Sequence, residues 1–139
     1  MLERDYILRL LSKFFEELSL YLNRKHKGIE DQIETFYTSY FRPSEFYINN
    51  NKEDILKSLS EYQKDEEEYR MEMLAELLCQ DGLEREDGNK INLLQKSLFL
   101  YERLDELSTT YSFERKRKIQ EILGIIEYCM QKEKESSDK

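Results

Sequence analysis

The chain has 139 residues, 37% of them charged, and its net charge at pH 7 is −8. Affinity for phosphate groups comes mainly from Lys and Arg, so this balance disfavours nucleic acid and anionic membrane surfaces as partners. No stretch between charged residues exceeds seven positions, too short for a membrane-spanning helix. The chain has only one proline and four glycines, and its apolar residues recur at helical spacing, which predicts an all-α fold.

The first predicted helix runs from about Arg4 to Lys25. Its apolar side chains cover more than half of the circumference, whereas a helix on a single layer needs a stripe upwards of ~100° wide. Such a helix is either central to a bundle or covered on its second side by another chain. Tyr6, Leu10 and Phe14 are the candidates for self-association, most simply as a homodimer with two-fold symmetry.

A second helix is expected from Ile29 to about Phe41. Pro43 ends it, because the residue before a proline avoids helical geometry. Residues 44–51 are expected to be a connector without a helix of their own. Asn51 is predicted to be the N-cap of a third helix, Lys52–Gln63.

The acidic run Asp65–Glu68 suits the first turn of a fourth helix, where negative charge complements the helix dipole. This helix is expected to reach about Leu83, with Gly82 and Gly88 bracketing its exit. A fifth helix is predicted from about Asn89 to Thr109.

Ser112 is the predicted N-cap of a sixth helix, which runs from Phe113 to about Met130. Residues 131–139 are polar and are expected to fray. Short turns make consecutive helices antiparallel neighbours. The sequence therefore predicts one domain over residues 1–130, an antiparallel bundle of five or six helices.

The stretch Ser97–Leu107 resembles the second helix of a tetratricopeptide repeat, with Leu74, Leu77 and Leu94 at positions where that repeat places apolar residues. The resemblance implies a repeat-like helical hairpin in the C-terminal half. The chain departs from the repeat at four positions, which indicates one unit and not an array: Leu78, Asp81, Lys90 and Glu102.

The opening of the chain resembles a family of small uncharacterised bacterial proteins that begin with an Asp-Tyr-Ile/Leu-x-Arg motif. The matching residues are Asp5, Tyr6, Ile7 and Arg9. This resemblance implies a first helix that carries the motif and repeat-like helices at the C-terminus. It implies no particular activity.

The residue types needed for catalysis are scarce. His26 is the one histidine; it follows a basic run and is interpreted as a solvated cation at a helix C-terminus, in preference to a phospho-acceptor. Leu83 and Arg85 occupy positions where a calcium loop would need oxygen ligands. We therefore expect no enzyme activity, no cofactor and no metal site.

Two further features bear on location and partners. Cys79 and Cys129 are interpreted as small hydrophobes, and charged residues at positions 3–5 replace the apolar run of a secretory signal, so a cytoplasmic protein is expected. The basic run Arg115–Lys118 could grip phosphates. On a helix its members point in four directions, which favours pairing with acids of the middle helices.

Six aromatic residues gather around Pro43 and form the best binding candidate. They are Phe36, Tyr37, Tyr40, Phe41, Phe46 and Tyr47. Aromatic residues dominate interface hot spots but also ordinary cores, and the core interpretation is favoured. The sequence thus predicts a non-enzymatic protein–protein interaction or scaffold protein that self-associates. The alternative is a small-ligand or peptide-binding bundle that uses the aromatic cluster.

Overall fold

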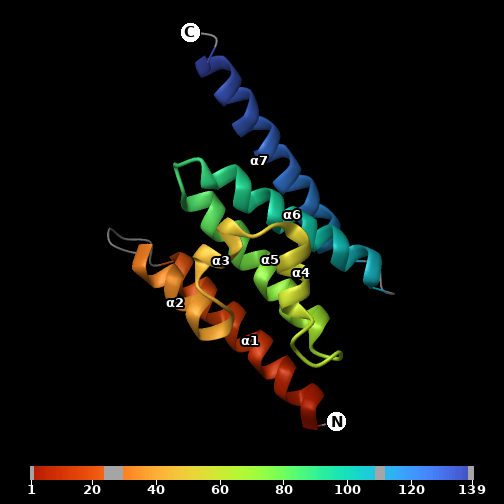
Figure 1. Ribbon diagram of the computed structural model, residues 1–139. Coiled ribbons are helices and arrows are strands. Elements are labelled where there is room, and N and C mark those ends of the chain that lie inside the picture. The colour runs from red at the N-terminus through yellow and green to blue at the C-terminus, as the bar shows by residue number, and fades with distance from the viewer. Residues whose placement is uncertain (1, 24–29, 109–111, 138–139) are drawn as a thin grey trace. The chain divides into compact units, whose positions relative to one another are not determined.

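The computed structural model describes residues 2–23, 30–108 and 112–137. These residues form helices and no strand, so the predicted all-α class is confirmed (Figure 1). Among them, no helix combines the length and the apolar character that crossing a bilayer requires. The helices in chain order are α1 (Leu2–Asn23), α2 (Glu30–Tyr40), α3 (Ser44–Asn49), α4 (Lys52–Leu59), α5 (Glu67–Glu84), α6 (Asn89–Leu107) and α7 (Phe113–Ser137).

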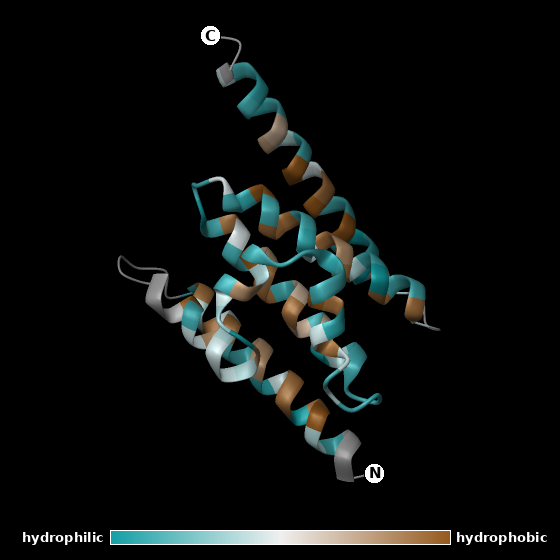
Figure 2. Ribbon diagram, viewed as in Figure 1, coloured by the Kyte–Doolittle hydropathy of each residue, from teal (hydrophilic) through white to brown (hydrophobic). Residues whose placement is uncertain are grey.

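The internal contacts of the chain divide it into two compact units. Unit 1 is Met1–Leu74 and unit 2 is Ala75–Lys139, so the boundary falls inside α5. The single domain expected over residues 1–130 stays a prediction. Figure 2 shows that apolar residues recur along α1 in unit 1 and along α7 in unit 2.

Two caps and one stop predicted from local sequence are confirmed. The Asn51 side chain accepts a hydrogen bond of 2.8 Å from the Asp54 amide at the start of α4. The Ser112 hydroxyl accepts one of 3.1 Å from the Arg115 amide at the start of α7. Helix α2 ends at Tyr40, ahead of Pro43. In each case the residue affects a helix end no more than three positions away, so the sequence alone was sufficient to predict it.

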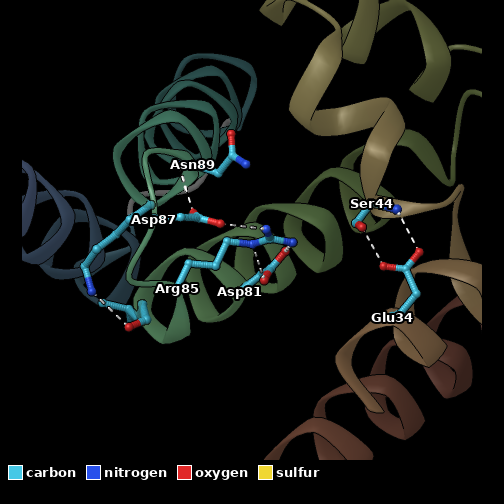
Figure 3. Close-up of polar contacts among 8 residues, drawn as sticks. Glu34, Ser44, Asp81, Arg85, Asp87 and Asn89 are labelled. Atoms are coloured by element: carbon cyan, nitrogen blue, oxygen red, sulfur yellow. Dashed lines mark hydrogen bonds and ion pairs between the residues drawn. The ribbon is translucent and has the colours of Figure 1, made fainter. Parts of the chain in front are cut away.

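The expectation of a helix-free connector over residues 44–51 is wrong, because α3 occupies most of it. Glu34 on α2 explains the difference. Its carboxylate accepts a 3.0 Å hydrogen bond from the Ser44 amide and a second bond from the Ser44 hydroxyl, as Figure 3 shows. The carboxylate satisfies a donor that the first turn of a helix leaves open. The third predicted helix is also shorter than expected, because α4 ends at Leu59.

In unit 2, α6 is antiparallel to the part of α5 that belongs to this unit. The Ser97 hydroxyl donates to the Ala75 carbonyl at 2.6 Å, whereas Gly82, further along α5, lies against the earlier α6 residues Lys90 and Leu94. The exit of α5 was expected between Gly82 and Gly88, and the helix ends there, at Glu84; Gly82 lies buried in the last turn. A Cβ atom there would be 3.0 Å from Leu94 Cγ, so glycine permits this close approach of the two helices.

Helix α7 is longer than predicted. It continues to Ser137, so the expected helix end near Met130 is wrong. The added turns consist mainly of Lys, Glu and Gln, which are strong helix formers, and Lys132 lies over the ring of Tyr128 one turn earlier, 5.5 Å from its centroid. The tetratricopeptide-like character of this half stays a prediction. The interpretation of His26 concerns a position outside the described residues.

Candidate interaction surfaces

The aromatic cluster around Pro43 is largely the core of unit 1. Tyr37 is fully buried and Tyr47 is 1% exposed, and their rings stack with centroids 5.7 Å apart. Phe36 and Tyr40 meet the buried ring of Phe14 on α1 edge-on, at 6.0 and 5.1 Å. Edge-to-face pairs at these distances are favourable beyond the area they bury. These contacts support the core interpretation.

The tyrosines of this core keep their hydroxyl groups hydrogen-bonded. Tyr40 donates to the Glu17 carboxylate at 2.8 Å, and burial together with this acceptor raises the pKa of Tyr40 to about 12. The Tyr47 hydroxyl accepts from the Arg42 amide at 3.3 Å, and burial raises the pKa of Tyr47 as well. Tyr62 donates to the Tyr40 carbonyl at 3.2 Å. The polar ends of the rings therefore tie α1, α2 and the segment after α4 together.

The remaining members of the cluster lie at its rim. Phe41 and Phe46 are half-buried. The Arg42 guanidinium lies 4.6 Å from the Phe46 ring centroid and contacts both carboxylate oxygens of Glu61 at 2.6 Å. Arg42 thus covers the exposed side of the cluster and links the α2–α3 corner to the end of α4.

The self-association candidates do not share one environment. Phe14 is fully buried in the ring contacts described above, so it is not available to a partner. Leu10 is half-buried and Tyr6 is 57% exposed. The fully buried stripe of α1 is narrow, and apolar side chains remain exposed on both sides of it: Tyr6, Leu8 and Leu20.

The outer face of α1 carries a shallow open hollow of about 510 Å³. Ser12 lies in it, and its small side chain leaves a depression ringed by longer ones. The lining residues, all on α1, are Asp5, Leu8, Arg9, Ser12, Lys13 and Glu16. Sequence reasoning missed this feature, although the small Ser12 among longer side chains was its signal.

In unit 2, Glu76 on α5 joins three helices. Its carboxylate accepts hydrogen bonds from the Tyr101 hydroxyl on α6, from Lys118 on α7 at 3.3 Å and from Gln80 at 2.9 Å. Cys79 lies one turn further along α5 and is buried; burial raises the pKa of its thiol to about 11. A thiol that stays protonated at neutral pH is a poor nucleophile, so this cluster has the character of a structural link.

Arg115, Lys116 and Lys118 of the basic run at the start of α7 pair with acids of unit 2, as the sequence predicted. Arg115 contacts Asp105 at 3.3 Å and Lys116 contacts the same carboxylate, whereas Lys118 reaches Glu76. The hydrogen bond from Lys116 and the one from Arg115 hold the pKa of Asp105 below its usual value. These side chains are engaged by acids of the same unit.

The acidic segment between α5 and α6 is also paired internally. Arg85 contacts Asp81 at 3.0 Å and Asp87 at 3.6 Å, and Asp87 accepts a 2.9 Å hydrogen bond from the Asn89 amide (Figure 3). An arginine therefore lies between the carboxylates that a cation would need. Among the side chains that the structure describes, no group of three or more His, Cys, Asp or Glu residues could hold a metal ion.

Comparison with known proteins finds no matching family model, no matching curated protein and no matching solved structure.

Proposed function

We propose that this protein is a non-enzymatic interaction protein that self-associates through α1. The observation that carries the proposal is the incomplete cover of that helix. Its buried stripe includes Ile7, Phe14 and Leu18, yet Leu8 is 39% exposed on one side of the stripe and Tyr6 is 57% exposed on the other. Half-buried Leu11 and Phe15 widen the apolar surface next to Leu8.

A second copy of the chain is the simplest cover for such a surface, because a two-fold pair buries the same patch on both partners. Soluble monomers rarely leave a contiguous apolar patch of more than a few hundred Å² in contact with water. The aromatic cluster does not support the alternative of a small-ligand or peptide site. Its central rings, Tyr37 and Tyr47, fill the space between their own helices.

Sedimentation equilibrium at micromolar concentration tests the proposal. We expect a species of twice the chain mass of 17.0 kDa. Leu8→Glu should shift it towards the monomer, because a charge would enter the covered surface. The matched control is Leu107→Glu, the same change at a leucine on α6 that is 45% exposed. A monomer at all concentrations, or equal effects of the two substitutions, would contradict the proposal.

A further inference from the structure

Two opposite charges flank the hollow at Ser12. Arg9 and Glu16 are both exposed, and neither forms an ion pair with another described residue of α1 or of unit 1. They are seven positions apart, about 10.5 Å along the helix axis, too far for a pair within α1. Each lies about one turn from Ser12, on opposite sides of it along the helix.

From this arrangement we infer that a second copy of the chain packs its α1 antiparallel across the hollow, with the two-fold axis beside Ser12. The inference rests on the proposed self-association and specifies its geometry. An axis midway between positions 9 and 16 brings Arg9 of each copy level with Glu16 of the other. Two identical ion pairs then form across the interface, as two-fold symmetry requires.

A parallel pair would bring like charges together. Arg9 would face Arg9 and Glu16 would face Glu16, and like charges at such distances destabilise association. Lys13 lies next to the axis and approaches its own copy in either orientation, so the choice depends on Arg9 and Glu16. The antiparallel orientation is therefore the one that the charges of this face favour.

The same axis suits the apolar and small residues of the face. Leu8 of one copy falls within two residue rises, about 3 Å along the axis, of Phe15 of the other. Ser12 lies where the helices cross, and a small side chain there allows the close end of the usual ~8–10 Å separation. The hollow of about 510 Å³ around Ser12 is the space that the second helix would enter.

A charge-exchange cycle measured by sedimentation equilibrium at low salt tests this geometry. Arg9→Glu alone and Glu16→Arg alone should each weaken the dimer about tenfold, because each change converts two attractions into two repulsions. The double variant should recover most of the wild-type affinity, since the pairs reform with reversed sign. At high salt the differences should shrink.

The net charge of −8 makes this cycle specific. General repulsion between acidic chains would be eased by Glu16→Arg, so weakening by that variant requires a local partner for Glu16. Lys57→Glu on α4, an exposed position with the same charge change as Arg9→Glu, is the matched control and should leave the dimer within twofold. Circular dichroism of each variant verifies that it is folded.

The outcomes separate this inference from the proposed function. A dimer that Leu8→Glu dissociates but that the double charge variant does not restore overturns the antiparallel pairing and leaves self-association through α1 in place. A wild-type chain that remains monomeric overturns both. Recovery in the double variant supports both.

Discussion

The helices of the two units are packed together by different kinds of side-chain contact. Ring-to-ring contacts recur in unit 1, between positions 14 and 47. In unit 2 the buried side chains are mainly Leu and Ile, and hydrogen bonds from Ser97, Tyr101 and Lys118 link α6 and α7 to α5.

Helix length explains the contrast. In unit 1, α2, α3 and α4 have 11, 6 and 8 residues, too few for a long repeating apolar face. Large rings with hydrogen-bonded hydroxyl groups hold such short helices, since one ring buries 150–250 Å². In unit 2, α6 and α7 have 19 and 25 residues, and regular Leu and Ile faces suffice, with polar links setting their register.

Among the substitutions that test this difference between the units, removal of a central ring should have the largest effect on stability. We expect Tyr37→Ala to lower the free energy of unfolding by about 3–5 kcal/mol, the usual cost of truncating a buried aromatic side chain. Tyr128→Ala, the same change at a 61% exposed ring on α7, should cost about 0.5 kcal/mol. Urea unfolding followed by far-ultraviolet circular dichroism measures both. Similar losses would show that unit 1 does not depend on its rings.

An intermediate effect concerns the polar links. Glu76→Ala removes the acceptor shared by Tyr101, Lys118 and Gln80 in unit 2 and should cost about 2–3 kcal/mol, because hydrogen bonds to a charged group are lost. Glu17→Ala in unit 1 removes the acceptor of Tyr40 and should cost about 1 kcal/mol.

The control for this pair is Glu76→Gln, which keeps an acceptor for Tyr101 and removes the charge that attracts Lys118. Its cost should fall between those of Glu76→Ala and the wild type. If Glu17→Ala proved the more damaging substitution, polar links would matter more in unit 1 than in unit 2, contrary to the contrast drawn above.

The smallest expected effect is a difference between the units in how their stability depends on pH. The pKa of Tyr40 is raised to about 12 from 10.0 in the folded protein, so its contribution to stability is complete below pH 10 and is lost as the pH rises towards 12. The pKa of Asp105 is lowered from 3.8, so its contribution is present above that pH and is lost as the pH falls through the folded value.

Urea midpoints measured across the pH range should therefore show that Tyr40→Phe flattens the alkaline decline and Asp105→Asn flattens the acid decline. Each variant serves as the control for the other. Unchanged slopes in both variants would mean that neither group links protonation to folding.

Local sequence signals were reliable where cause and effect lie within one turn of helix. Asn51 and Ser112 cap the helices that they precede, and α2 ends ahead of Pro43. The signals failed where a residue far away in the sequence determines the local structure. Helix α3 depends on Glu34, which reaches Ser44 from ten positions away. The exit of α5 between Gly82 and Gly88 was predicted correctly, but the close approach of Leu94 from α6 to Gly82 was not, because it depends on a residue twelve positions away.

The candidate site shows the same division. The apolar breadth of α1 follows from sequence, since a helix repeats every 3.6 residues whatever surrounds it. The sequence does not show which part of this apolar surface remains exposed. Phe14, predicted to meet a partner, is buried by Phe36 and Tyr40, whereas Leu8, not singled out, is left on the outer face.

By itself, the sequence determined the helical class, most helix starts and the excess of apolar surface on α1, because these depend on spacing and on contacts within a few residues. Only the tertiary structure decided which apolar side chains are covered, which acids pair with the basic run and where Ser12 leaves a hollow between longer side chains. The reason is that burial and ion pairing are properties of side chains brought together from distant positions, and one-dimensional periodicity carries no record of which distant positions meet.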